Sequence, residues 1–233
     1  MDKYRVKIID MKEEAPGIKT LFLEQPSDVN WLEGAHMHIG LSGFDEGELP
    51  NKNWVHHLSI MTLQEDHKIG FTTKIQPPFS EFKEKLADLH IGDEVILFKI
   101  GSRMFLRREN KPIILVSMGV GIATMRPLVL RFLKDKARIP QLININVNST
   151  KDYVYQKELD PLQNSIYKNY WIDSRSKFYE TLDAISDQKD AIYYVVGSDE
   201  FVKDMIRFLK NKRIKEEQIL IDKKEEMKAS YFG

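Results

Sequence analysis

A glycine-rich stretch at residues 117–127, SMGVGIATMRP, has the residue types that suit dinucleotide binding. It follows a short apolar run at residues 112–116, typical of a buried parallel strand, and it precedes a helical pattern. Gly119 and Gly121 have no side chains, so their backbone can turn sharply and approach a ligand closely. The first turn of the following helix would point unpaired N–H groups at the same place, which suits a pyrophosphate.

The local pattern leaves a second interpretation open. The common dinucleotide fingerprint G-x-G-x-x-G has a third glycine where this chain has Thr124, and no acidic residue is evident after the next strand. A glycine-rich turn from strand to helix without any ligand would have the same local sequence. The stretch therefore needs support from other motifs.

Other constellations of reactive residues are weaker. His36 and His38 place two imidazoles on one face of a predicted strand, but spacing ties no further ligand to them, so we expect no metal site. Neither G-x-S-x-G nor H-E-x-x-H occurs, which leaves hydrolase chemistry without a motif.

Composition excludes several classes of protein. The 233 residues carry 35 basic and 35 acidic side chains, so nothing indicates binding to nucleic acid or to an anionic membrane. The absence of cysteine excludes disulfides, thiolate-held iron–sulfur clusters and cysteine zinc sites. We see no signal peptide and no apolar stretch that could span a bilayer, and we expect a cytoplasmic protein.

Short strands dominate the first half of the chain. We predict them at residues 4–10, 20–24, 35–41, 54–62, 69–75 and 94–100, with turn residues between them. Ser80 is placed to cap one helix at residues 81–87. Several short strands at this spacing favour a small antiparallel barrel or sandwich.

Strands alternate with helices in the second half. We predict strands at residues 113–116, 141–147, 167–172, 191–196 and 218–221, and helices at 124–136, 156–163, 178–187 and 201–211. This alternation indicates a parallel sheet with right-handed crossovers. A polar run at residues 106–111 separates the halves, so we expect two domains, 1–107 and 108–233.

This domain order, together with several motifs, resembles the ferredoxin–NADP reductase superfamily over nearly the whole chain. The resemblance implies a flavin-binding Greek-key β-barrel over residues 1–107. It implies a Rossmann-like α/β domain over residues 108–233 that binds NAD(P), with the sheet flanked by helices.

The first family motif, R-x-Y-S or R-x-Y-T, is similar to His56-His57-Leu58-Ser59 in this chain. In the family the arginine holds the flavin pyrophosphate, the tyrosine covers the ring and the hydroxyl bonds the reactive N5 atom. Ser59 matches this pattern, whereas His56 and Leu58 depart from it. A mostly neutral imidazole is a weaker partner for an anion than a guanidinium.

Further motifs extend the resemblance. The segment Pro78-Phe79-Ser80, with Thr73 and Lys74 ahead of it, resembles the family's contacts with the phosphate arm of the flavin, although an ordinary capped helix fits the same residues. The glycine turn resembles the family's dinucleotide turn, which implies roles for Gly119, Val120, Gly121, Ile122, Ala123 and Thr124.

The second half carries the remaining implied positions. Gly197 matches a family turn, although relatives have cysteine at Val196. Ser174 and Arg175, with Lys177 and Tyr179, resemble a set that binds the 2′-phosphate of NADPH; a solvated charged loop is the alternative. In the tail, Asp222 is implied as an acid that acts on flavin reactivity. Tyr231 and Phe232 are implied as candidate aromatic lids, and a frayed tail is the alternative.

The resemblance implies a flavin-dependent NAD(P)H oxidoreductase that holds FAD, or FMN, and uses NADPH or NADH. Hydride would pass from the nicotinamide to flavin N5, with Ser59 and Asp222 as the catalytic residues. Electrons would then go to a separate acceptor, which is a ferredoxin, a flavodoxin, another protein or a small molecule. The alternatives are an electron-relay subunit of a larger complex with weak turnover, or a nucleotide-sensing protein without flavin.

Overall fold

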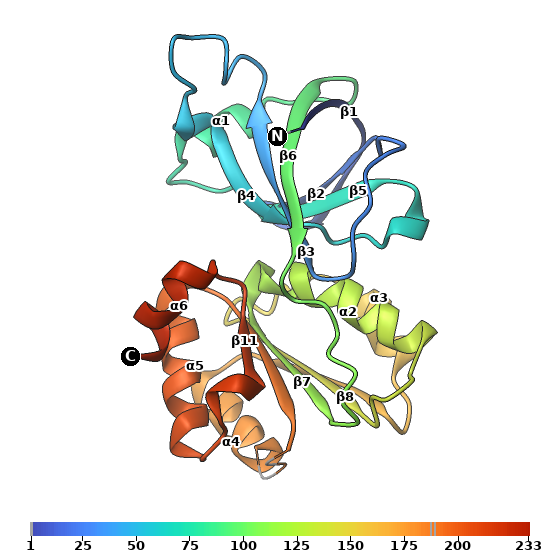
Figure 1. Cartoon of the computed structure of the whole chain (residues 1–233), viewed down its shortest axis with the longest axis vertical. Helices are drawn as coiled ribbons and strands as arrows, with labels where there is room; N and C mark the ends of the chain where they lie inside the picture. Colours follow the sequence, from blue (N-terminus) through green and yellow to red (C-terminus); the bar gives the residue numbers. More distant parts are fainter. Residues whose placement is uncertain (1, 187, 189) are drawn as a thin grey trace. The chain divides into compact units, whose positions relative to one another are not determined.

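The computed structural model describes residues 2–186, 188 and 190–233 (Figure 1). The chain divides into two compact units, one ending at Phe105 and the other beginning at Leu106. Each unit has a hydrophobic core of its own. None of the helices in the described part of the chain is long and apolar enough to cross a membrane.

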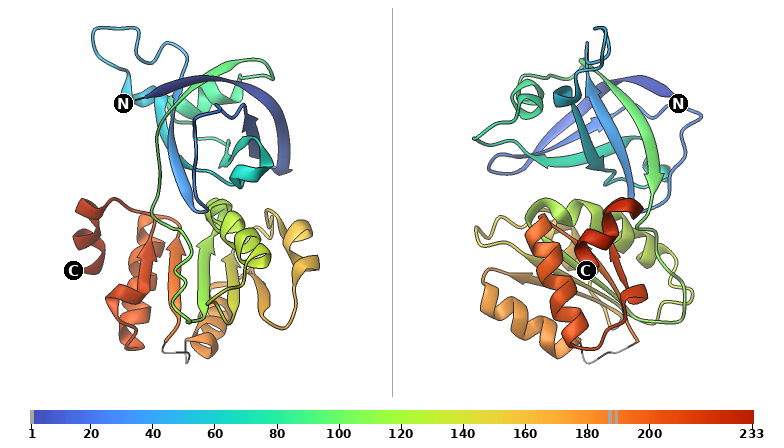
Figure 2. Two further views of the ribbon diagram at one scale, coloured as in Figure 1. Left: turned by 45° about the vertical axis from the view of Figure 1, so that its right-hand side comes forward. Right: turned by 60° about the vertical axis from the view of Figure 1, so that its left-hand side comes forward.

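An antiparallel sheet forms the first unit. Its six strands in the described residues lie in the order β4-β3-β6-β1-β2-β5 and curl into a half-barrel (Figure 2). The strands are β1 (Lys3–Ala15), β2 (Ile18–Leu23), β3 (Ala35–Leu41), β4 (Val55–Ser59), β5 (Ile69–Lys74) and β6 (Glu94–Ser102). Alternate apolar residues such as Val6 and Ile8 are buried inside, as the period of a strand requires. The predicted antiparallel fold is confirmed, and β4 and β5 are its edges.

Helix α1 (Glu81–Ala87) contacts both edge strands. Phe82 and Leu86, four residues apart, are buried in the barrel core, and Ser80 caps the helix as predicted. The Phe82 ring stacks on the His56 ring of β4, while the Lys83 ammonium donates a hydrogen bond to the Thr73 hydroxyl of β5. One short helix therefore joins residues from two predicted motifs.

A parallel sheet forms the second unit, with strands in the order β11-β10-β7-β8-β9. The strands are β7 (Ile113–Met118), β8 (Leu142–Val147), β9 (Tyr167–Ile172), β10 (Ile192–Val196) and β11 (Ile219–Ile221). The helices are α2 (Ile122–Lys134), α3 (Gln156–Leu159), α4 (Arg175–Ile185), α5 (Asp199–Asn211) and α6 (Glu225–Phe232). The predicted Rossmann-like architecture is confirmed.

Helices cover both faces of this sheet (Figures 1 and 2). Residues of α4, α5 and α6 share one hydrophobic cluster with Ile143 and Ile145 of β8, so these helices pack on that face. Helix α2 packs on the opposite face, where it contacts β7 and β8. Strands buried on both sides explain the nearly continuous apolar runs of the sequence.

Several element boundaries differ from expectation. The strand predicted at 54–62 is shorter in the structure. Residue 54 belongs to a 3-10 turn over Lys52–Trp54, and β4 ends at Ser59. The helix predicted from residue 124 begins at Ile122, directly after a 3-10 turn over Gly119–Gly121. The helix predicted at 178–187 is α4, which starts at Arg175; residue 187 lies outside the described residues.

The charged tail is ordered into a helix, α6. Its two aromatic side chains, Tyr231 and Phe232, are 7% and 9% exposed and lie in the core of the second unit. Burial of these rings stabilises a helix that the sequence pattern did not predict. The alternative of a frayed tail is therefore wrong.

Candidate dinucleotide and flavin sites

The turn after β7 is shaped to receive a ligand. Gly119 has φ +53°, in the left-handed region that glycine adopts most readily, and a Cβ atom built on it would meet nothing within 4 Å. Helix α2 follows with no side-chain cap and no acidic residue in its first turn. The N–H of Ile122, the first in α2, already donates to the carbonyl oxygens of Gly119 and Val120, so the donors for an anion would come from the turn over Gly119–Gly121 that precedes the helix.

A second turn lies against the first. A Cβ atom on Gly121 would approach the carbonyl oxygen of Val196, at the end of β10, to 3.0 Å. A Cβ atom on Gly197 would lie 3.3 Å from Cβ of Met118. Glycines thus permit close contact between the turns after β7 and β10. Because the strand order reverses between these strands, this is the crevice in which doubly wound sheets bind their ligands.

Asn146 supports the turn from the neighbouring strand β8. Its Nδ2 atom donates to Ser117 Oγ at 2.9 Å and to the carbonyl oxygen of Gly119 at 3.1 Å. Ser117 and Asn146 are 0% and 1% exposed, so the network is fully buried. The motifs did not reveal Asn146, although an asparagine that alternates with apolar residues in a buried strand was the available signal.

A pocket of about 490 Å³ lies past the end of β9. Lys151, Asp173 and Lys177 line it, and the Asp173 carboxylate pairs with Lys151 at 3.2 Å and with Lys177 at 3.5 Å. These two ammonium groups, Lys151 first, hold the pKa of Asp173 below its ordinary value. The sequence motifs included Lys177 but missed Asp173, the acid between the two lysines.

The implied phosphate-binding pair Ser174-Arg175 begins α4, next to this pocket. Arg175 is exposed and pairs with Asp204 at 3.2 Å, and its guanidinium lies 5.6 Å from the centre of the Tyr179 ring. Ser174 occupies the N-cap position without making a side-chain cap bond. The cationic side chains implied for a 2′-phosphate are thus each paired with a carboxylate.

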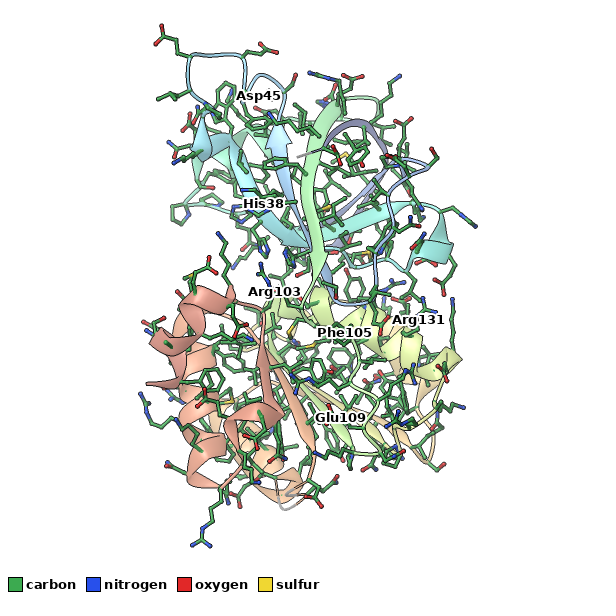
Figure 3. All side chains as sticks on the ribbon, viewed as in Figure 1. His38, Asp45, Arg103, Phe105, Glu109 and Arg131 are labelled. Atoms are coloured by element: carbon green, nitrogen blue, oxygen red, sulfur yellow. The ribbon has the colours of Figure 1, made fainter. Side chains whose placement is uncertain are left out.

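Three imidazoles gather on the outer face of β3 and β4. His57 pairs with His38 across the strands, and Ser59 pairs with His36. The His57 ring centre lies 4.6 Å from that of His36 and 5.3 Å from that of His38, which Figure 3 labels. Burial, followed by the charges of His57, Arg103 and His38, lowers the pKa of His36 to about 4. Ser59 therefore pairs with a histidine that is neutral at pH 7.

The other residues of the first two motifs take different positions. Leu58 is buried in the barrel core, whereas Lys74 at the end of β5 is exposed. Phe79 is 45% exposed, and the Ser80 hydroxyl accepts the backbone N–H of Lys83 at 3.3 Å. Pro78 belongs to the loop before α1. The roles of these residues toward a flavin stay predictions.

The implied catalytic acid and lid lie near the C-terminal helix. Asp222 directly follows β11 and is half-buried. Burial raises the pKa of Tyr231, and Lys223, within hydrogen-bonding reach of its hydroxyl, also pairs with Asp199 at 2.7 Å. These contacts tie α6 to the start of α5 within the second unit. Flavin contacts of Asp222 and Tyr231 stay predictions.

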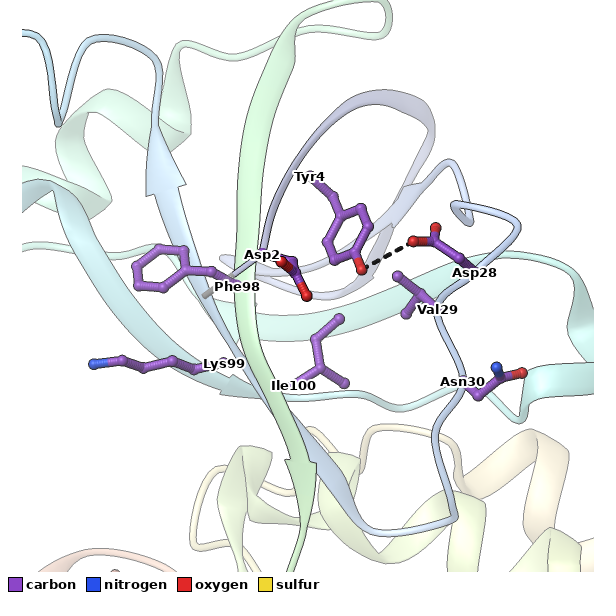
Figure 4. Close-up of a pocket in the computed structure, with 8 residues that line it drawn as sticks. All are labelled: Asp2, Tyr4, Asp28, Val29, Asn30, Phe98, Lys99 and Ile100. Carbon is purple, nitrogen blue, oxygen red and sulfur yellow. Dashed lines mark hydrogen bonds between the residues drawn. The ribbon is translucent and has the colours of Figure 1, made fainter.

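A further pocket of about 300 Å³ lies in the first unit (Figure 4). Tyr4, Asp28 and Phe98 are among its lining residues, and the Tyr4 hydroxyl donates to Asp28 at 3.1 Å. None of its lining residues belongs to the motifs described above. The pocket is therefore separate from the predicted flavin contacts.

No protein-family model matches the chain. The chain is 24% identical over 137 residues to a probable dihydroorotate dehydrogenase B (NAD(+)) electron transfer subunit from Methanopyrus kandleri. That match covers 59% of this chain and 47% of the relative, so it spans about half of the relative's length. It indicates distant homology.

Solved structures match almost the whole chain. A ferredoxin NADP+ reductase from Neisseria gonorrhoeae with bound FAD and NADP has a TM-score of 0.80 at 14% identity, covering 95% of this chain and 98% of that one. A ferredoxin reductase in carbazole 1,9a-dioxygenase has a TM-score of 0.77 at 16% identity, covering 95% of this chain and 69% of that one. At such identities the likeness establishes the fold.

Proposed function

We propose that this chain, which has the two-domain fold of the ferredoxin–NADP reductases, is a flavin-dependent NAD(P)H oxidoreductase. The observation that carries the proposal is the contact between the two glycine turns beside the uncapped start of α2. This arrangement leaves open space at Gly119 and N–H donors for a pyrophosphate.

Each unit has residues that fit its ligand. In the first unit, the Ser59 hydroxyl and the groups around α1 are suited to hydrogen-bond a flavin and its phosphate. In the second, the turn at Gly119 and α2 would bind and orient the dinucleotide. A bound flavin accepts hydride from reduced nicotinamide and releases electrons onward. The protein's own contribution is orientation, polarity and exclusion of water.

We further propose that the coenzyme is NADH. The carboxylate of Asp173 is fixed between Lys151 and Lys177 at the pocket beyond β9. The ribose hydroxyls of NADH would donate hydrogen bonds to this carboxylate, whereas the 2′-phosphate of NADPH would have to compete with it for the two lysines. Arg175, the implied phosphate ligand, is already paired with Asp204. This proposal differs from the NADPH binding that the resemblance of Ser174 and Arg175 implies.

The electron acceptor in this proposal is a separate molecule, because the chain has no cysteine with which to hold an iron–sulfur cluster. A ferredoxin, a flavodoxin, another protein or a small molecule fits this role. The distant relative is named as an electron transfer subunit, which favours a second candidate function. In that case the chain relays electrons within a larger complex and turns over weakly alone.

The test is spectroscopic. Purified protein should show flavin absorption, either directly or after FAD or FMN is added. Without oxygen, NADH should bleach this absorption rapidly, and NADPH should do so slowly. Protein that stays colourless with either flavin would overturn the proposed function. A coloured protein that neither coenzyme bleaches would favour the relay subunit.

A further inference from the structure

Lys83 on α1 is a half-buried lysine for which the described residues of the first unit supply no counter-ion. Its ammonium donates a hydrogen bond to the hydroxyl of Thr73, which is 4% exposed on the edge strand β5. Among described residues 2–105, no carboxylate lies within ion-pair distance of Lys83. Burial lowers the pKa of Lys83 to about 8, so the ammonium form carries a desolvation cost that the neutral Thr73 hydroxyl offsets only in part.

The surroundings of Lys83 suit an anion. Thr73 offers a hydroxyl on one side, and on the other the His56 ring stacks on Phe82 with ring centres 5.1 Å apart. Partial burial of that ring, then the charge of Lys83, lowers the pKa of His56 to about 4. At neutral pH His56 is therefore an uncharged hydrogen-bonding group, and the positive charge among these contacting residues belongs to Lys83.

We infer that Lys83 binds the phosphate group of the flavin, in the place of the arginine that the resembling family motif has at His56. Thr73 and His56 complete this contact with a hydroxyl and an imidazole. The inference rests on the proposed function. It also accounts for a feature of the sequence that otherwise weakens that proposal, namely the missing guanidinium. In this chain the positive charge would therefore come from Lys83 on α1, whereas in the family motif it comes from an arginine at the position of His56 on β4.

The alternatives on nearby elements are poorer. Lys74 is exposed at the end of β5, so water would screen its attraction to a phosphate. Lys85 lies over the Trp54 ring, with Nζ 4.2 Å from the ring centre. Lys85 nevertheless has the same charge on the same helix, two residues away, which makes Lys85→Met a matched control for Lys83→Met.

The test uses three flavins that differ in phosphate content. Riboflavin has no phosphate, FMN has one and FAD has a pyrophosphate. Binding to the full chain is measured by the change in flavin fluorescence, with no coenzyme present. We expect Lys83→Met to weaken FMN and FAD binding by roughly 10- to 100-fold, the effect of losing one hydrogen bond to a charged group, and to leave riboflavin binding unchanged. Lys83→Arg should retain most of the affinity, and Lys85→Met should retain all of it.

A second readout needs no ligand. Because no carboxylate among residues 2–105 pairs with the Lys83 ammonium, Lys83→Met removes a poorly compensated charge and should keep or raise the melting temperature of the flavin-free protein. The same melting temperature also shows whether the variant is folded. A lysine that served only the structure would lower it when removed.

The outcomes separate this inference from the proposed function. Equal loss of riboflavin and FMN binding, or no loss of either, would refute the role of Lys83 while leaving a flavoprotein. Failure of the wild-type protein to bind any of the three flavins would refute both. If FMN and FAD binding weaken equally, one phosphate contact suffices; a larger loss for FAD would place Lys83 on the pyrophosphate.

Discussion

Asn146 Nδ2 donates a hydrogen bond of 3.1 Å to the carbonyl oxygen of Gly119, and so ties the end of β8 to the turn after β7. The side chain of Asn146 thus holds the carbonyl of Gly119, a residue with positive φ. A Cβ atom on Gly119 would meet no other atom within 4 Å. The turn is therefore preorganised before any ligand arrives, which lowers the entropy cost of binding.

Removing this support should impair coenzyme binding. Asn146→Ala removes the donor to the buried Ser117 hydroxyl and the link from β8 to the Gly119 carbonyl, so we expect about 1–3 kcal/mol of lost stability and weaker NADH binding. Flavin binding should not change. Asn144→Ala is the control, because Asn144 is equally buried on the same strand but donates to Asn169 at 3.1 Å, away from the turn. Equal coenzyme affinity in the two variants would contradict a positioning role for Asn146.

The open space at Gly119 gives a second prediction. Gly119→Asn keeps a residue that tolerates the left-handed conformation, at a cost of about 1 kcal/mol, but extends a side chain to where the pyrophosphate would lie. We expect severely weakened NADH binding in a folded protein, measured by calorimetric titration. Gly92→Asn is the control, because Gly92 also has positive φ and open space but lies in the first unit. Normal NADH affinity in Gly119→Asn would remove the turn from the site.

Much of this organisation was predictable from the sequence. The order of strand and helix patterns predicted the architecture of both units. Strand β9, for example, has the same bounds in the sequence pattern and in the structure. The glycine turn was predictable because glycine reports backbone geometry directly. What could not be predicted is which polar side chains from neighbouring elements meet. Asp173 between two lysines and Lys83 beside Thr73 are visible only after the elements pack.

Coenzyme choice depends on Asp173. Asp173→Ser removes the carboxylate and frees Lys151 and Lys177 to contact a 2′-phosphate. We expect the preference for NADH over NADPH, measured as the ratio of the two kcat/KM values, to fall by roughly 10-fold or more. Glu180→Ser, at another acid that lines the same pocket, controls for a general change of charge. An unchanged ratio would exclude Asp173 as the discriminating group.

The stability of the first unit should depend on pH through His36. The pKa of His36 in the folded chain is about 4, below the ordinary histidine value of about 6.5. The unfolded chain therefore binds more protons between these values, and His36 must destabilise the fold as pH falls from about 6.5 toward 4. We expect His36→Gln to flatten this part of the profile of urea midpoint against pH. A variant profile parallel to that of the wild type would show that other groups cause the loss.

Ser59 tests the proposed chemistry itself. It ends β4 opposite His36, and the family resemblance gives its hydroxyl the hydrogen bond to flavin N5. Ser59→Ala removes one neutral hydrogen bond, so we expect flavin reduction by NADH to slow by roughly 3- to 10-fold in stopped-flow measurements. Flavin affinity and melting temperature should stay close to wild type, because the alanine keeps the strand pairing. Ser59→Thr, which restores a hydroxyl, should recover part of the rate. A rate in Ser59→Ala equal to that of the wild type would exclude Ser59 from the reaction.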